Sequence, residues 1–298
     1  MFRIGLFIIS NIAILALLGI TFRLLGLEGL LAENGVDLNL QALLVYAAVL
    51  GFSGSIISLL ISKPMAKRSM RVELIKSPQS QQERWLISTV ERQAKQMNIG
   101  MPEVGIFPSR SPNAFATGWN RNNALVAVSQ GLLEHMTQDE VEAVLAHEVS
   151  HVANGDMVTM TLLQGVMNTF VVFLSRVIGH FVDRVVFKVE RGHGPAFWIV
   201  SIVAELILGV LAMIITMWFS RYREFRADAG AASIVGKHKM IAALEKLQMG
   251  NKVAEAKVPD EIAAFAINAG RIHALFSSHP PLEKRIQALK EHGARRVD

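Results

Sequence analysis

Long apolar runs, separated by two polar blocks, dominate the pattern along the chain. The first run, Ile4–Phe22, and the second, Leu38–Ser62, contain no charged residue. Each is long enough to cross a hydrocarbon core of about 30 Å. The first run has no small-residue cleavage site after it, which favours an uncleaved anchor over a signal peptide. We therefore predict two N-terminal transmembrane helices; a helical hairpin buried in a soluble core is the alternative.

Charged residues at the ends of these runs predict the orientation of the pair. The segment between the two runs contains three acidic residues and, beyond Arg23, no basic one. Five basic residues follow the second run: Lys63, Lys67, Arg68, Arg71 and Lys76. Basic residues gather on the cytoplasmic side of membrane proteins. The N-terminus and the chain after the second run are therefore expected in the cytoplasm.

Two further apolar runs, Met157–Phe181 and Pro195–Phe219, are interrupted by Arg176, His180 and Glu205. Charged groups inside a membrane span are costly, so they usually pair or face a cavity. In an antiparallel hairpin, Arg176 and Glu205 meet at a similar depth, and we predict that they pair. We favour two true spans here, for a total of four; the alternative is a hairpin packed partly on the rest of the protein.

The two polar blocks predict one folded unit that both halves of the chain build. The first block favours a helix over about Ser80–Met97 and three short strands: Val104–Phe107, Asn113–Thr117 and Ala124–Val128. The second block is mainly helical, and together the blocks hold about 170 residues, enough for a core. The expected fold is a membrane α-helical protein with four hydrophobic helices and a mostly helical α+β domain that contains a small sheet. Its expected parts are 1–62 (transmembrane hairpin), 63–156 (first half of the domain), 157–219 (second hydrophobic hairpin) and 220–298 (second half).

Composition restricts the chemistry that this unit can carry. The 298 residues include no cysteine, which excludes disulfides, iron–sulfur clusters, cysteine nucleophiles and thiolate metal sites. Only 18% of the residues are charged, too few for a disordered protein. The net charge is +5, but the basic residues cluster at the ends of apolar runs, which disfavours a nucleic-acid partner. Any metal must therefore be held by His, Asp or Glu.

One predicted helix carries a pattern typical of metal chemistry. Thr137 and Glu140 form a capping box at its start. Further along, His147-Glu148-x-x-His151 places two imidazoles one turn apart on one face, with Glu148 about 100° around the helix from His147. Two such imidazoles can hold one cation, while the glutamate reaches a water without being a ligand. This is the arrangement of zinc peptidases; a surface helix with two incidental histidines is the alternative.

A third protein ligand is expected just after the fourth apolar run. Glu224 and Asp228 lie one helical turn apart there. One carboxylate can bind a metal while the other accepts the N–H of a ligand imidazole. An exposed, arginine-rich helix face is the alternative. The helix with His147 leads into the third run and Glu224 follows the fourth, so a hairpin through the membrane returns the chain to the same side.

These motifs resemble those of the HtpX membrane zinc metalloproteases, a family that shares its superfamily with the CAAX prenyl proteases. The resemblance covers nearly the whole chain, and its motifs are His147-Glu148-x-x-His151, Asn154-Gly155-Asp156 and Ser220-Arg221-x-x-Glu224-x-x-Ala227-Asp228. It implies an endopeptidase of the bacterial inner membrane, with its active site in a cytoplasmic, zincin-like catalytic domain that is mostly helical with a small edge-exposed sheet. The implied function is quality control of misfolded or damaged membrane proteins, and of unfolded proteins, under stress. The implied partners are protein substrates, the lipid bilayer and other quality-control proteases.

The resemblance also implies roles for individual residues. It implies one zinc ion per chain held by His147, His151 and Glu224, with Glu148 as the general base and with Asp228 and Asn154 supporting the ligands.

Two further elements resemble the family less specifically. The segment Asn113, Ala114, Phe115 and Ala116 resembles its substrate-binding edge strand, which pairs with an extended peptide through the backbone; an ordinary core strand is the alternative. His279, in Ser278-His279-Pro280-Pro281, resembles a His-Pro element whose histidine donates to the oxyanion. An ordinary helix start with proline is the alternative for that motif.

Two other functions stay open at this point. A prenyl-protein-type processing protease shares the same metal site, but it is expected to need more spans and a larger membrane chamber. A non-enzymatic membrane transporter or ion-binding scaffold, with Arg176 and Glu205 as its pathway, leaves His147 and His151 without a role.

Overall fold

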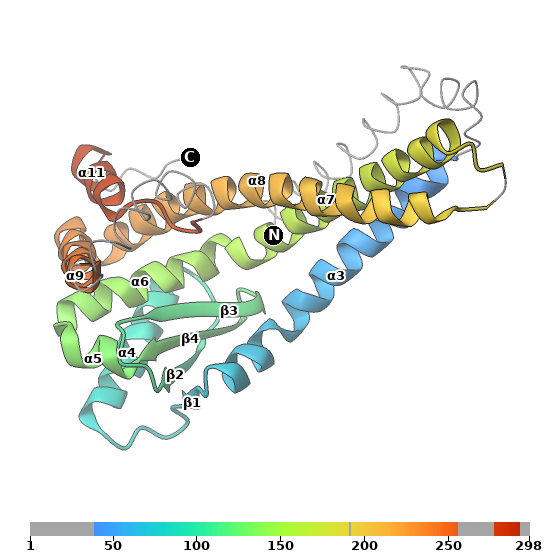
Figure 1. The fold of residues 1–298 in the computed structure, drawn as a ribbon. Helices are drawn as coiled ribbons and strands as arrows, with labels where there is room; N and C mark the ends of the chain where they lie inside the picture. The colour runs from blue at the N-terminus through green and yellow to red at the C-terminus, as the bar shows by residue number, and fades with distance from the viewer. Residues whose placement is uncertain (1–38, 191, 256–276, 293–298) are drawn as a thin grey trace. The chain divides into compact units, whose positions relative to one another are not determined.

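The structure, a computed structural model, describes residues 39–190, 192–255 and 277–292 (Figure 1). The first predicted span, Ile4–Phe22, lies outside the described residues. The described chain is mostly helical, with one small sheet. Its elements are α3 (Leu40–Ser69), β1 (Glu73–Leu74), α4 (Gln81–Gln96), β2 (Glu103–Phe107), β3 (Ala114–Asn120), β4 (Asn123–Ser129), α5 (Gln130–His135), α6 (Gln138–Asn154), α7 (Asp156–Phe181), the π-helical turn η1 (Val182–Val186), α8 (Pro195–Val235), α9 (Lys237–Glu255) and α11 (Leu282–His292).

The described residues divide into two compact units. The first unit comprises the described residues up to Ser58 together with Thr159–Thr216, and it takes most of the apolar length of α3, α7 and α8. Each of these three helices is long and apolar enough to cross a membrane. The second, third and fourth predicted apolar runs are therefore helical.

Close packing and one ion pair define the first unit. A Cβ atom on Gly51 would lie 2.6 Å from the backbone nitrogen of Thr169, so α3 and α7 approach where only glycine fits. Arg176 on α7 and Glu205 on α8 lie 3.4 Å apart, between Nη2 and Oε1. The predicted pairing of these two interrupting charges is confirmed, as expected for an antiparallel hairpin.

The second unit comprises Leu59–Val158 and the described residues from Met217 onward, and it contains the sheet (Figure 1). The strand order is β1-β2-β4-β3. β2 and β4 are parallel and the other pairs are antiparallel, so the sheet is mixed. β4 is central and almost wholly buried, whereas β3 lies at one edge. All three predicted strands are present.

Two capped helices pack beside this sheet and fix the site. Ser80 and Glu83 form a capping box at the start of α4, and Thr137 and Glu140 form the predicted one at α6. Both boxes satisfy N–H groups that the first helical turn leaves unpaired. The apolar face of α6 enters the main core, which also includes residues of α4, β4, α9 and α11. The helix with the histidines is therefore rigidly embedded.

Gly155 separates α6 from α7 by a single residue. It takes a left-handed φ of 72° and its N–H bonds back to the last turn of α6. Glycine adopts this conformation without the steric penalty of a side chain. α7 begins at once with Asp156, so this aspartate directly follows the last turn of α6, which carries His151.

Candidate metal centre

Two buried imidazoles on α6 face one another. His147 and His151 lie one turn apart, as the spacing predicts, and their rings meet edge to face at 84°. Their Nε2 atoms are 3.1 Å apart. Both residues are less than a tenth exposed, although α6 packs its other side into the core. The histidines therefore line an interior site and are not incidental surface residues.

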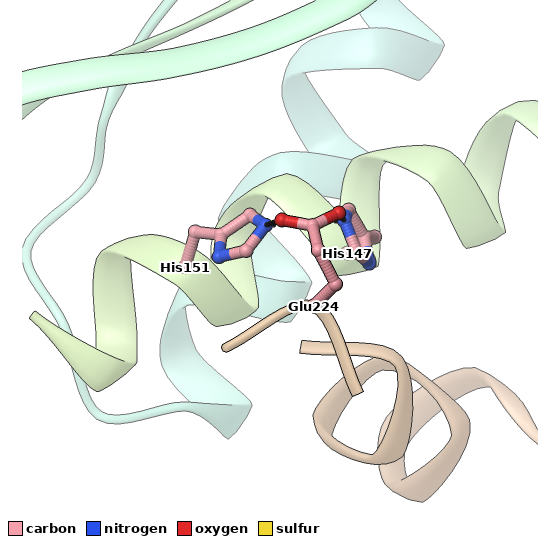
Figure 2. A group of neighbouring side chains, drawn as sticks. All are labelled: His147, His151 and Glu224. Carbon is pink, nitrogen blue, oxygen red and sulfur yellow. Dashed lines mark hydrogen bonds and ion pairs between the residues drawn. The ribbon is translucent and has the colours of Figure 1, made fainter. Parts of the chain in front are cut away.

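The carboxylate of Glu224 from α8 completes this group (Figure 2). Its Oε1 lies 3.2 Å from Nε2 of His151, and its Oε2 lies 3.5 Å from Nε2 of His147. Glu224 is fully buried. Of the two candidate carboxylates on α8, Glu224 is thus the one that faces both Nε2 atoms.

The other nitrogen of each ring faces a second carboxylate. Nδ1 of His147 lies 2.9 Å from Asp228, and Nδ1 of His151 lies 2.6 Å from Asp156. Because an ionised carboxylate only accepts hydrogen bonds, these contacts place the ring proton on Nδ1 in each neutral imidazole. The Nε2 lone pairs are then free to bind a cation between the rings.

The two imidazoles and the carboxylate lie at separations close to those around a tetrahedral zinc ion. Ligand atoms about 2.0–2.2 Å from such an ion lie about 3.3–3.6 Å from one another. The two Nε2 atoms are 3.1 Å apart, and the two oxygens of Glu224 lie 3.2 Å from Nε2 of His151 and 3.5 Å from Nε2 of His147. The buried Oε1 of Glu224 also makes no hydrogen bond within the described residues, because its approach to His151 lacks the right geometry. These residues fit a metal ion, and a cation would satisfy the unpaired oxygen.

The electrostatics of the group favour a positive charge. Burial lowers the pKa of His151, but its close contacts with the carboxylates of Asp156 and Glu224 outweigh burial and raise the pKa to about 9. Burial raises the pKa of Glu224, but the close contacts with His147, His151 and His279 hold that pKa well below its ordinary value. A group of side chains that binds protons this strongly carries excess negative charge, which also favours a metal cation.

Arg285 on α11 is a member of this site that the sequence patterns do not single out. Its Nε and Nη2 bind the two oxygens of Asp228 at 2.8 and 2.6 Å. Its Nη1 lies 3.5 Å from Oε2 of Glu224, and the residue is only 6% exposed. Burial lowers the pKa of Arg285, but the hydrogen bond and charge of Asp228 raise it above its ordinary value. Arg285 therefore fixes Asp228 while Asp228 orients His147.

His279 reaches the same carboxylate from the segment before α11. Its Nδ1 lies 2.6 Å from Oε2 of Glu224, and its side chain is 60% exposed. Arg221 holds this segment, because its Nη1 donates to the carbonyl of Ser277 at 2.9 Å. Pro280 and Pro281 directly precede α11, so the segment begins this helix. It also contributes His279 to the site, so the two interpretations of the motif are compatible.

Two other predicted residues lie on α6 itself. Glu148 is partly exposed, and its charge is near enough to raise the pKa values of His151 and Arg285. Asn154 lies at the end of α6, and the structure gives its buried Nδ2 no hydrogen-bond partner among the described residues. Asp156, two residues later, makes the contact with a ligand histidine.

The predicted substrate strand lies beside the metal-site helix. Ala114 and Ala116 of β3 pack against the core to which α6 belongs, while Phe115 packs against Phe107 on the other side, with ring centroids 5.4 Å apart. Asn113 immediately precedes the strand, and its N–H donates to Oγ of Ser129 at 2.9 Å. Because β3 is an edge strand, one side of its backbone is not paired within the sheet that the structure describes.

The comparison with known proteins agrees with this geometry. Residues 80–292, more than half of the chain, match the family described as Peptidase family M48. Protease HtpX of Pseudoalteromonas atlantica is 72% identical over 98% of this chain and 100% of its own length. Protease HtpX of Thioalkalivibrio sulfidiphilus is 62% identical over 97% of this chain and 98% of its own length. The chain belongs to the HtpX group of peptidase family M48. The family resemblance of its motifs is confirmed, and with its three long apolar helices the chain is a membrane metalloprotease.

A solved structure supports the fold. The crystal structure of S. mikatae Ste24p resembles this chain with a TM-score of 0.61 and 19% sequence identity. The alignment covers 91% of this chain and 66% of Ste24p, so about a third of that longer protein has no counterpart here. At this identity the likeness concerns the fold, and it shows that the arrangement of helices and sheet belongs to a known architecture.

Proposed function

We propose that the chain is a zinc endopeptidase of the bacterial inner membrane that cleaves misfolded or damaged membrane proteins, and unfolded proteins, at the cytoplasmic face. The convergence of His147, His151 and Glu224 within one buried group carries this proposal. We assign one zinc ion per chain to these three ligands. Glu148 lies on the same helix, and its partly exposed side chain suits proton transfer.

The mechanism follows from the groups around this site. When bound, the zinc ion supplies Lewis acidity that polarises the scissile carbonyl and activates water. Glu148 takes a proton from the attacking water and passes it to the leaving amine, a role worth on the order of 10²–10⁴ in rate. Asp228 and Asp156 hold the two ligand imidazoles in the tautomer that leaves each Nε2 free.

His279 is proposed to donate to the oxyanion of the tetrahedral intermediate. Its exposed ring and its contact with Glu224 place it at the border between the metal ligands and solvent. Because Nδ1 already faces a carboxylate, Nε2 can donate to the oxyanion only when both ring nitrogens are protonated. The contact with Glu224 fixes the orientation of the ring, so it supports the assigned role.

The edge strand β3 is proposed to bind the substrate. An extended peptide can add to its free edge through backbone hydrogen bonds at Asn113, Ala114, Phe115 and Ala116. Backbone pairing depends little on side chains, and the two alanines leave room for varied substrate residues. Such a site suits a protease that cleaves many unrelated, unfolded segments.

The cytoplasmic location of the site is supported by the basic residues after the second apolar run. The chain has no cysteine, so a single cysteine at an exposed position such as Gln287 can report the topology without background labelling. We expect a membrane-impermeant maleimide to label Gln287→Cys in inverted inner-membrane vesicles but not in intact spheroplasts. Labelling in intact spheroplasts would contradict the cytoplasmic assignment.

Replacement of Glu148 tests the mechanism. Glu148→Gln should keep a full equivalent of zinc but lose cleavage of an unfolded protein by about 100-fold or more, because the amide cannot accept the proton. Glu134→Gln, on the exposed face of α5, is the matched control and should cleave like the unaltered protein. His147→Ala should lose the metal, measured by elemental analysis. Unchanged cleavage by Glu148→Gln, or full zinc in His147→Ala, would contradict the assignment.

The choice of substrate separates the proposed function from the prenyl-protein alternative. The purified protein in detergent is offered an unfolded soluble protein, a destabilised membrane protein and a prenylated peptide. We expect zinc-dependent cleavage of the first two. Cleavage of the prenylated peptide alone would favour a processing protease, and cleavage of none by the zinc-loaded protein would contradict the proposed activity.

A further inference from the structure

Trp119 lies on the surface at the turn of the β3–β4 hairpin, with 45% of its area exposed. The strand register shifts between Gly118 and Asn120. Gly118 has a φ of 147°, and a Cβ atom there would lie 2.3 Å from the carbonyl oxygen of Asn123. The irregularity therefore depends on glycine. It leads directly into a large aromatic side chain that the sheet does not cover.

A lysine ties this turn to the polar end of α3. Lys63 directly follows Ser62, where the charge-free run of α3 ends. Its Nζ donates to Oδ1 of Asn123 at 2.6 Å and lies 3.3 Å from Glu103. The side chain of Lys63 is only 13% exposed, so these contacts hold it in place. The turn therefore contacts the residue at which the charge-free run of α3 ends.

The surface around the turn combines apolar, aromatic and basic groups. Met101 is 45% exposed, and its neighbour Gly100 donates its N–H to Oδ1 of Asn122 at 3.0 Å. No hydrogen bond or ion pair joins Arg121 to another residue in the described part of the chain. We name residues 119–123 together with Met101 the hairpin tip. The tip combines one positive charge with two exposed, large apolar side chains.

We propose that the hairpin tip docks into the headgroup region of an anionic phospholipid bilayer, with Trp119 as its anchor. Tryptophan is enriched at membrane interfaces because one side of its ring system is apolar and its N–H needs a polar partner. The guanidinium of Arg121 complements lipid phosphates. The contact between Lys63 and Asn123 sets the tip at the depth where α3 leaves the hydrocarbon core.

The proposed docking has a consequence for the substrate strand, and this consequence rests on the proposed function. β3 ends at Asn120 in the hairpin tip and begins at Ala114, beside the core that holds α6. With its tip at the headgroups, the strand extends from the membrane surface toward the metal site. A segment that emerges from the bilayer is then presented to the strand without a further transfer through water.

Tryptophan fluorescence tests the docking directly. The chain has four tryptophans, so replacing three of them by phenylalanine leaves a single reporter in the full-length protein. One variant retains only Trp119 and the matched control retains only Trp85, which packs against the core of the second unit. Both are reconstituted in vesicles of phosphatidylcholine and phosphatidylglycerol that carry bromine either near the headgroups or near the chain ends.

We expect bromine near the headgroups to quench most of the Trp119 emission, bromine near the chain ends to quench much less, and neither to quench Trp85 strongly. Quenching of Trp119 no stronger than that of Trp85 would overturn the proposal and leave the tip open for a protein partner. Stronger quenching by the deep bromine would overturn the interfacial location. Neither readout depends on proteolysis, so a failure here is distinct from a failure of the proposed activity, which the Glu148→Gln assay measures.

Discussion

Asp156 and Asp228 serve the two ligand histidines in the same way, but only Asp228 also binds a buried arginine. Each accepts the Nδ1 proton of one imidazole, at 2.6 and 2.9 Å. Replacing either by asparagine keeps the shape but removes the charge that makes the imidazole a better ligand. Such changes beyond the ligands typically lower metal affinity 10–100-fold. We expect this loss, about 1.4–2.7 kcal/mol of binding free energy, in both variants.

The stability of the metal-free protein should separate the two variants. Asp228→Asn leaves Arg285, which is 6% exposed, without the carboxylate that binds two of its nitrogens. Removing one partner of a buried ion pair costs about 3–5 kcal/mol. Asp156→Asn removes a negative charge from the first turn of α7, worth about 0.3–1 kcal/mol, and it leaves His151, which can release its proton as Arg285 cannot. The free energy of unfolding should therefore be lower in Asp228→Asn by at least about 2 kcal/mol.

Two measurements on the purified protein in detergent check this reasoning. Competition with a chromophoric chelator gives the zinc affinity, and denaturant unfolding of the metal-free protein gives the stability. Asp139→Asn is the control, because Asp139 is exposed on α6 and pairs with Lys239 at 2.7 Å away from the site. Unaltered zinc affinity in Asp156→Asn, or equal destabilisation of the Asp156 and Asp228 variants, would refute the assigned division of roles.

Two further predictions concern protons and the apolar hairpin. The pKa of His151 is raised to about 9, so in the metal-free protein near pH 7.5 this imidazole is protonated, and zinc uptake should release about one or two protons per ion. Calorimetry in two buffers of different ionisation enthalpy measures that release, and zero release would contradict the raised pKa. Arg176→Met alone should destabilise the detergent-solubilised protein more than Arg176→Met with Glu205→Gln, because the single change leaves an unpaired charge. Additive losses of thermal stability in this double-mutant cycle would contradict the pairing.

The parts of the fold that the sequence predicts are those set by local periodicity. The capping box at Thr137 and the four-residue spacing of His147 and His151 both depend on one helix, so they follow from helical geometry alone. The pairing of Arg176 with Glu205 also follows from simple geometry, because a hairpin of two apolar helices brings residues at similar depths together. Each of these predictions depends on a single helix or on a single hairpin of two consecutive helices.

Asp156 and Arg285 were not predicted, because their roles depend on contacts that no local pattern contains. Asp156 reaches His151 across the break between α6 and α7, where Gly155 takes its left-handed conformation. The glycine was visible in the sequence, but the direction of the following helix was not. Arg285 offers one usable signal. At about 100° per residue it lies close to Leu289 on the apolar face of α11, and a charged residue there indicates a buried partner.

The charges buried around the site indicate a divalent ion. Asp156, Glu224 and Asp228 are three buried carboxylates, and Arg285 is the one permanent cation buried with them in the described part of this unit. Three negative charges and one positive charge leave a net charge of −2. Without a metal, protons on the two imidazoles supply the compensation, as the raised pKa values of His147 and His151 indicate. A divalent cation replaces both protons and leaves the interior neutral, so the metal completes the charge balance of the fold as well as the chemistry of the site.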